Sequence, residues 1–146
     1  MPTPVSRVKH YTGRCLCGAV RYECGEPVSA AGLCHCESCR RASGAHAVAW
    51  ATVRQNQFRF IAGTPQRYAS SPPVQRTFCG TCGTPLTYWH RDDVDTIDIT
   101  VSSLDDANAF APASHTWMID APVWDRPHDD LNQFRTTIEA GAPFDP

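Results

Sequence analysis

The cysteines constrain this chain more than any other feature. Seven of the eight lie in tight clusters, and only Cys24 stands alone. The clusters are Cys15-x-Cys17, Cys34-x-Cys36-x-x-Cys39 and Cys79-x-x-Cys82. Cysteines so near each other rarely meet disulfide geometry, and short spacings of this kind are typical of metal ligands. The fold must therefore bring the clusters to one or more metal ions.

Two of the clusters complement each other as a structural zinc site. The segment Cys79–Gly83 has the form C-x-x-C-G of a zinc knuckle, and Cys15–Gly18 reads C-x-C-G. A glycine after the second cysteine permits a positive φ, which lets backbone N–H groups point at the sulfurs. Each segment supplies two of the four ligands of a closed site, which stabilises a fold by on the order of 10 kcal/mol. We predict a structural zinc ion bound by Cys15, Cys17, Cys79 and Cys82.

The remaining cluster supplies three thiols, Cys34, Cys36 and Cys39, without an evident fourth ligand. Structural zinc has four protein ligands, whereas catalytic zinc has three and an open position. A closed second site would need His35, Cys24 or a distant histidine, and an iron–sulfur centre would also need four ligands at other spacings. A thiol that enters an open position would lose its proton to the metal. The predicted chemistry is thiol capture and activation, in preference to hydrolysis.

Charged residues beside this cluster are further candidates. His35 lies between two proposed ligands and is a candidate proton carrier; the alternative is a side chain that points away from the ion. Arg40 and Arg41 are candidates for binding a substrate carboxylate, although a solvated helix face explains them as well. His46 is expected to begin a strand beside the cluster, as a satisfied histidine on a sheet face.

Short runs with a period of two predict an all-β fold of mainly antiparallel sheets. The runs are 20–24, 45–53, 58–61, 86–90 and 96–101, and twelve prolines separate many of them. One or two short helical turns are expected, at 40–44 and 104–107. We predict one domain over 1–146, with an irregular leader at 1–12 and the motifs between about 13 and 134.

Composition excludes several classes of function. The net charge is −2 and the longest basic cluster is Arg40-Arg41, so a nucleic-acid-binding surface is not expected. No apolar run approaches the roughly 18 residues of a membrane span. Residues 1–4 lack the charged and apolar regions of an export signal, which predicts a cytoplasmic protein.

The cysteine motifs occur in order within longer patterns. These are G-x-C-x-C-G-x-V-x-Y from Gly13, C-H-C-x-x-C-R-x-x-S-G-A from Cys34 and R-x-F-C-x-x-C-G from Arg76. A tail with His115, Trp117 and Trp124 follows. Together they resemble the glutathione-dependent formaldehyde-activating enzyme family, in its broad branch with the C-H-C-x-x-C-R-x-x-S-G-A pattern.

The resemblance implies a fold, two metal sites and a reaction. The fold would be of the zinc-binding β-tent type, with a structural zinc on four cysteines and a catalytic zinc on Cys34, Cys36 and Cys39. The reaction would be that of a carbon–sulfur lyase, which joins glutathione to formaldehyde as S-hydroxymethylglutathione. The partner would be a small thiol such as glutathione. The alternative is a non-catalytic, zinc-stabilised binding module in which both ions are structural.

Overall fold

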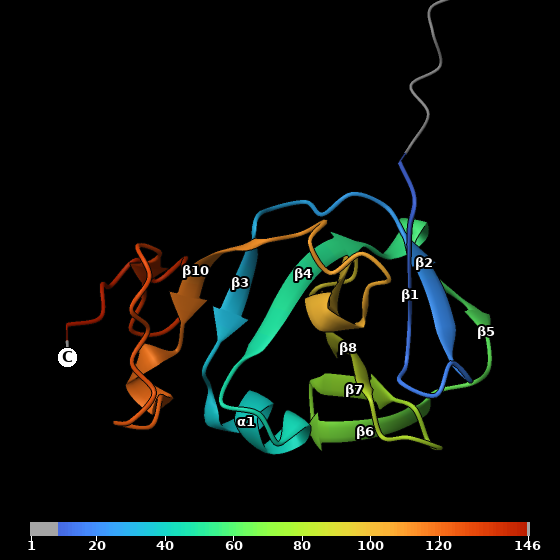
Figure 1. Cartoon of the computed structure of the whole chain (residues 1–146), viewed down its shortest axis with the longest axis horizontal. Coiled ribbons are helices and arrows are strands. Elements are labelled where there is room, and N and C mark those ends of the chain that lie inside the picture. The colour runs from blue at the N-terminus through green and yellow to red at the C-terminus, as the bar shows by residue number, and fades with distance from the viewer. Residues whose placement is uncertain (1–8, 146) are drawn as a thin grey trace, which may run out of the picture.

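Alternating apolar and polar residues build two β-sheets in the computed structural model, which describes residues 9–145. The smaller sheet has the order β1-β2-β5 and the larger, mixed sheet the order β11-β10-β3-β4-β9-β8-β7-β6 (Figure 1). The strands are β1 (Tyr11–Arg14), β2 (Arg21–Cys24), β3 (Ala31–Cys34), β4 (Val48–Arg54), β5 (Arg59–Ala62), β6 (Gln66–Ser71), β7 (Val74–Phe78), β8 (Pro85–His90), β9 (Thr96–Thr100), β10 (Pro112–Thr116) and β11 (Asn132–Gln133).

Helical structure is short. The helix α1 (Glu37–Ser43) follows β3 directly, and Gly44 ends it in the left-handed conformation. Three single 3-10 turns are η1 (Gln55–Gln57), η2 (Val101–Ser103) and η3 (Met118–Asp120). The helical turn predicted at 40–44 is thus confirmed as part of α1. The turn predicted at 104–107 is wrong, because the 3-10 turn η2 ends at Ser103 and residues 105–110 form bends and turns.

The predicted all-β class is confirmed, with differences at element boundaries. β4 begins at Val48, so His46 lies in the turn after α1 and does not begin a strand. β1 begins at Tyr11, inside the segment that was expected to be irregular; residues 1–8 of that segment lie outside the described residues. β10 pairs in parallel with both β3 and β11, an arrangement that the alternating runs did not predict.

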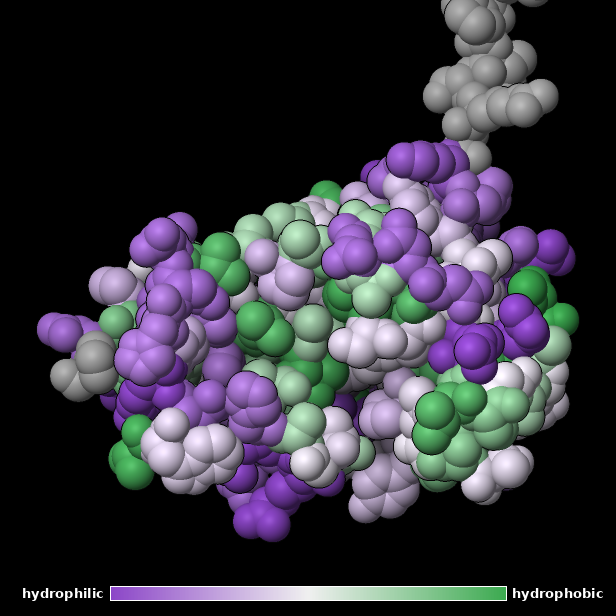
Figure 2. Space-filling model, in the orientation of Figure 1, coloured by the Kyte–Doolittle hydropathy of each residue, from purple (hydrophilic) through white to green (hydrophobic). Residues whose placement is uncertain are grey.

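The hydrophobic core joins the two sheets. Tyr22 and Cys24 of β2 are fully buried, as are Ala51 and Val53 of β4 and Ile99 of β9. Burying each larger apolar side chain stabilises the fold by roughly 1.5–3 kcal/mol. Figure 2 shows hydrophobic residues gathered in the middle of one face of the molecule, between the polar C-terminal segment and the smaller sheet.

The opposite face of β4 carries Trp50 and Thr52, because successive side chains in a strand point to opposite sides. This second face of the large sheet is available for a functional site. Within residues 9–145, the structure contains no helix that is both long and apolar enough to span a bilayer.

The packing around Gly63 leaves no room for a side chain. The φ of Gly63 is +69°, and a Cβ there would lie 2.1 Å from the carbonyl oxygen of Ala19. Gly44 has a similar φ of +67° but open space around it. A substitution at Gly44 therefore measures the cost of backbone strain alone, without a collision. We expect Gly44→Ala to cost about 1 kcal/mol of unfolding free energy and Gly63→Ala a few kcal/mol more, measured by urea denaturation at equal zinc. Equal losses in the two variants would contradict the packing described here.

Candidate metal centres

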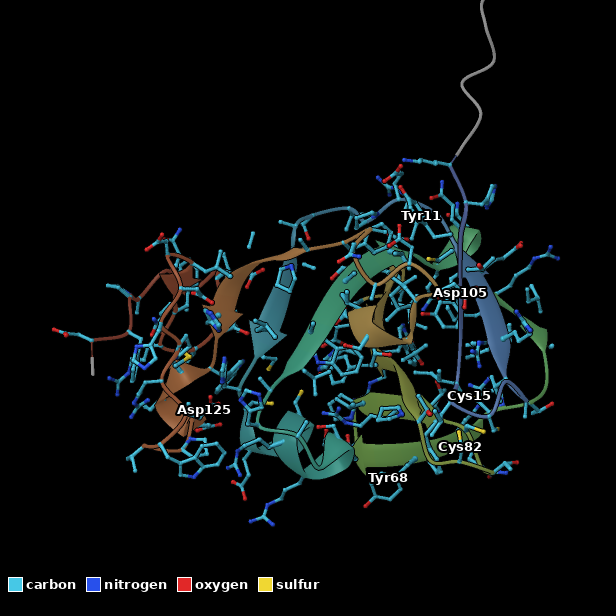
Figure 3. The ribbon with its side chains drawn as sticks, in the orientation of Figure 1. Tyr11, Cys15, Tyr68, Cys82, Asp105 and Asp125 are labelled. Carbon is cyan, nitrogen blue, oxygen red and sulfur yellow. The ribbon has the colours of Figure 1, made fainter. Side chains whose placement is uncertain are left out.

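Two turns from different sheets meet at the first cysteine cluster. Cys15 and Cys17 lie in the β1–β2 turn, and Cys79 and Cys82 in the β7–β8 turn. Their four sulfur atoms lie within 4.8 Å of one another. Figure 3 shows Cys15 and Cys82 together where these turns approach each other. The structure thus groups the four residues that were predicted to share an ion.

Both turns have the geometry of knuckles. The glycines that follow them, Gly18 and Gly83, have φ values of 78° and 81°. The Val20 N–H donates to the Cys15 sulfur at 3.3 Å. The Thr84 hydroxyl lies 3.2 Å from the Cys82 sulfur and lowers the pKa of that thiol to about 5. A contact that favours thiolate over thiol prepares the residue for a metal.

The sulfur spacing fits a tetrahedral ion. Cys17 lies 3.6 Å from Cys15 and 3.8 Å from Cys79, measured between sulfur atoms. Four metal–sulfur bonds of ~2.3 Å in a tetrahedron place the sulfurs about 3.8 Å apart. All eight cysteines are free of disulfides. The four thiols therefore form a site that a metal ion fits.

The second cluster is built at the junction of a strand and a helix. Cys34 ends β3, Cys36 is the N-cap of α1 and Cys39 lies in the first turn of the helix. The Cys39 N–H donates to the Cys36 sulfur at 3.3 Å, and the three sulfurs lie within 4.8 Å of one another. No fourth histidine, cysteine or carboxylate of residues 9–145 joins this group. Cys24 lies in the core, where burial raises its pKa to about 11.

The charges of the three thiols are interdependent. Hydrogen bonds with Cys36 and Cys39 raise the pKa of Cys34. Hydrogen bonds with Cys34 and Cys36, together with the positive charge of Arg76, lower the pKa of Cys39. Three sulfurs at this spacing repel one another when all are ionised, and a bound cation removes that repulsion. The donor set therefore also fits a metal ion.

These thiols face a cavity of about 590 Å³, within the range of small-molecule sites. Its lining includes Cys34, Cys36, Cys39, Trp50, Thr52, Ser70, Arg76, Tyr88, Asp98 and Glu139. Arg40 and Arg41 do not line it, and Arg41 forms an ion pair with Glu37 at 2.8 Å. The structure therefore does not place them to bind a substrate carboxylate in this cavity.

Arg76 is the cation of the cavity wall, and sequence reasoning noted it only as a motif residue. It is buried, and both terminal nitrogens lie 3.9 Å from the Cys39 sulfur. Its Nε donates to the Ser70 hydroxyl at 3.1 Å, and the guanidinium lies over the Tyr88 ring at 5.0 Å. A charge held in this way is oriented by contacts on several sides.

Asp98 is a second polar residue of the wall that sequence reasoning missed. Its carboxyl accepts a hydrogen bond from the Thr52 hydroxyl at 2.6 Å. Burial raises its pKa to about 6, and the Thr52 hydrogen bond opposes the rise. In the sequence, Asp98 is only the polar residue that alternates with Ile97 and Ile99. Finding its role would have required knowing which strands pair with β9 and in what register.

His35 and His115, which are both buried, belong to a chain of polar contacts that lies outside the cavity. Nε2 of His35 lies 2.9 Å from Nδ1 of His115, whose Nε2 lies 3.0 Å from the Asp129 carboxylate. Nδ1 of His35 faces Asp125 at 3.4 Å, and Asp125 also contacts His46 at 2.8 Å. Asp125 is labelled in Figure 3, in the tail beside the start of α1.

These contacts connect the segment 34–36 to the tail. His35 is buried and does not line the cavity. Burial and the nearby His115 lower its pKa, so the neutral imidazole is favoured. Its role as a proton carrier stays a prediction, whereas its contacts hold the backbone between Cys34 and Cys36 in place.

Comparisons with known proteins agree with the motifs. A family model described as glutathione-dependent formaldehyde-activating enzyme matches residues 10–120, which include all seven clustered cysteines. A crystal structure of a Rhodobacter sphaeroides protein is 28% identical and has a TM-score of 0.56; the match covers 65% of this chain and 88% of that one. A comparison with curated proteins finds no match.

The two clusters are expected to respond differently to loss of a ligand. With a zinc ion in each cluster, Cys82→Ser should release one of the two and lower the unfolding free energy by several kcal/mol, because an ion in the first cluster would link two sheets. Cys36→Ser should release one ion and leave the fold intact. Zinc content by mass spectrometry with urea denaturation measures both effects, and Cys24→Ala, outside both clusters, should retain two ions. Equal destabilisation by Cys82→Ser and Cys36→Ser would refute this division.

Asp98→Asn is expected to stabilise the protein at alkaline pH. The folded-state pKa of Asp98 lies above its ordinary value of 3.8, so ionising the carboxyl costs folding free energy as pH rises through about 6. The amide keeps an acceptor for Thr52 and avoids that cost. The gain should be on the order of 1–3 kcal/mol at pH 8 and should shrink towards pH 4.5. Urea denaturation of both proteins at equal zinc tests this; a gain independent of pH would contradict it.

Proposed function

The chain belongs to the glutathione-dependent formaldehyde-activating enzyme family, and we propose that it is a zinc-dependent carbon–sulfur lyase or carrier of small thiol adducts. The reaction is addition of a thiol to an aldehyde, with glutathione and formaldehyde giving S-hydroxymethylglutathione as the form that the family name implies. In this proposal Cys34, Cys36 and Cys39 hold the catalytic zinc, and the other four clustered cysteines hold a structural zinc.

The observation that carries the proposal is the convergence of three thiols, without a fourth ligand, on the wall of a cavity. Thiolate ligands favour zinc among the common metal ions of proteins. Zinc bound there would lower the pKa of a thiol that occupied its fourth position. The four-cysteine cluster, by contrast, is closed by its own side chains.

The cavity walls supply the positioning that such a reaction needs. Trp50 and Tyr88 offer flat apolar faces, while Thr52 and Ser70 offer hydroxyl groups. The uncatalysed addition of thiols to aldehydes is already feasible, so holding the two reactants together contributes much of the acceleration. In the addition, the thiol sulfur forms a bond to the carbonyl carbon; the lyase direction breaks that bond.

A glutathione-dependent reaction also favours a cytoplasmic location. That compartment is reducing, and all eight cysteines are free in the structure. A cytoplasmic setting keeps the three cavity thiols available to a metal ion.

A non-catalytic binding module is the second candidate. The tail exposes Val123 and Trp124, which are 83% and 75% accessible, and a protein partner that covered them would give the tail a purpose independent of the cavity. In that case both ions would be structural, and added thiols would leave the metal sites unchanged.

Thiol titration of the cobalt-substituted protein separates the two candidates. We expect glutathione to intensify the sulfur-to-cobalt absorption bands, because a further thiolate joins one of two ions. Cys36→Ser should abolish the change, and S-methylglutathione, which has no free thiol, should produce none. Absence of any spectral response to glutathione, cysteine and cysteamine in the wild-type protein would favour the binding module.

A further inference from the structure

Four side chains form a row across the floor of the cavity, one from each of four adjacent strands. Arg76 of β7 pairs with Tyr88 of β8. Tyr88 pairs with Asp98 of β9, and Asp98 pairs with Thr52 of β4. Directly opposite residues of antiparallel strands point to the same face, with Cβ atoms about 5 Å apart. The row therefore presents a cation and a carboxyl group to the cavity that the three cysteines line.

The guanidinium of Arg76 has capacity for a further acceptor. Its polar contacts within residues 9–145 are the Ser70 hydroxyl and the Cys39 sulfur. A buried guanidinium without a carboxylate partner is costly, and its remaining N–H groups need acceptors. Since the terminal nitrogens lie 3.9 Å from Cys39, an oxygen on a molecule held beside that sulfur is within their reach.

The carboxyl of Asp98 is placed to exchange a proton with the same molecule. The Thr52 hydroxyl donates to Oδ1 of Asp98, and within the described part of the chain Oδ2 of Asp98 accepts no hydrogen bond. Tyr88 lies between Asp98 and Arg76 in the row, and the guanidinium leans over its ring. A small molecule bound beside Tyr88 would therefore lie between the two groups.

We propose that Arg76 and Asp98 act on the carbonyl oxygen of the electrophile: Arg76 binds this oxygen as negative charge develops on it, and Asp98 supplies its proton. The inference rests on the proposed addition of a thiol to an aldehyde and names the residues that act on the aldehyde oxygen. An alkyl halide or a disulfide has no oxygen that gains charge, so the row would not assist its reaction.

The step balances without a further reactant. The thiolate sulfur forms a bond to the carbonyl carbon, and the π electron pair of the C=O bond moves to oxygen. That oxygen takes the proton of Asp98 and becomes a hydroxyl group. The proton that the thiol lost on ionisation restores the Asp98 carboxyl. In the reverse direction the Asp98 carboxylate takes the hydroxyl proton as the carbon–sulfur bond breaks.

The surroundings of Asp98 suit both directions. Thr52 faces it from β4 and Tyr88 from β8, while Asp93 and Cys39 act on it through their negative charges. Burial, with these charges, raises its pKa to about 6, so both protonation states are populated near neutral pH. The rate constant of the addition should therefore fall as pH rises through about 6.

The test compares Asp98→Asn and Arg76→Gln with two matched controls, Asp95→Asn and Arg67→Gln, which change exposed residues of the same types. Calorimetry measures glutathione affinity without aldehyde, and exchange NMR with labelled formaldehyde measures kcat. We expect Asp98→Asn to lower kcat 10- to 100-fold and to lose the inflection near pH 6, and Arg76→Gln to lower kcat about 100-fold. Glutathione affinity should stay within twofold. Both controls should match wild type.

Each other outcome has a definite meaning. A wild-type kcat in Asp98→Asn would overturn the role of Asp98, and affinity losses as large as the kcat losses would make the pair a thiol-binding element instead. If Arg76→Gln does not fold, Arg76→Lys is used instead, because it keeps the positive charge without the two planar N–H donors of the guanidinium. An unchanged kcat in that variant overturns the role of the guanidinium. Wild-type protein that binds no thiol would refute the proposed function itself, before any variant is compared. Wild-type protein that binds glutathione without accelerating exchange would refute only this inference and leave a carrier.

Discussion

Four thiols from two turns bring the two sheets of this protein together at one candidate metal site. The β1–β2 turn belongs to the smaller sheet and the β7–β8 turn to the larger, and their four thiols lie close enough to share an ion. The strands around them are short, so an ion at this point would add to the hydrophobic core that joins the two sheets. An ion bound there would join the two turns and so fix how the smaller sheet lies on the larger one.

The local parts of this arrangement could be predicted from the sequence. Ligand spacing is a property of a few consecutive residues, so the clusters and their pairing followed from the requirement for four ligands. Gly18 and Gly83 have the positive φ that their positions after a cysteine indicated. The alternating runs at 20–24 and 45–53 correctly predicted the strands β2 and β4, because the period of a strand is independent of its partners.

The remaining features depend on which strands become neighbours. Arg76 and Asp98 are separated by more than 20 residues, and only the order β7-β8-β9 brings them into one row. β10 has the sequence PASHT, with no apolar alternation, and it forms a strand because β3 offers a parallel edge. The role of His115 could not be derived from its neighbours, since its partners are His35 and Asp129.

The extended backbone between β3 and α1 directs the side chains of residues 34, 35 and 36 alternately to opposite sides. Sulfurs of Cys34 and Cys36 face the cavity, and the imidazole of residue 35 faces the tail, by the parity of alternate positions. Inserting or deleting one residue there would exchange the sides, so the length of this segment is fixed independently of any ion. Replacing His35 would remove its side-chain contacts with the tail without altering any of the three cysteines, while the backbone pairing of β10 with β3 would remain. The tail also supplies Trp117, Asp120 and Glu139 to the cavity wall, so a change in how the tail is held would alter the cavity as well.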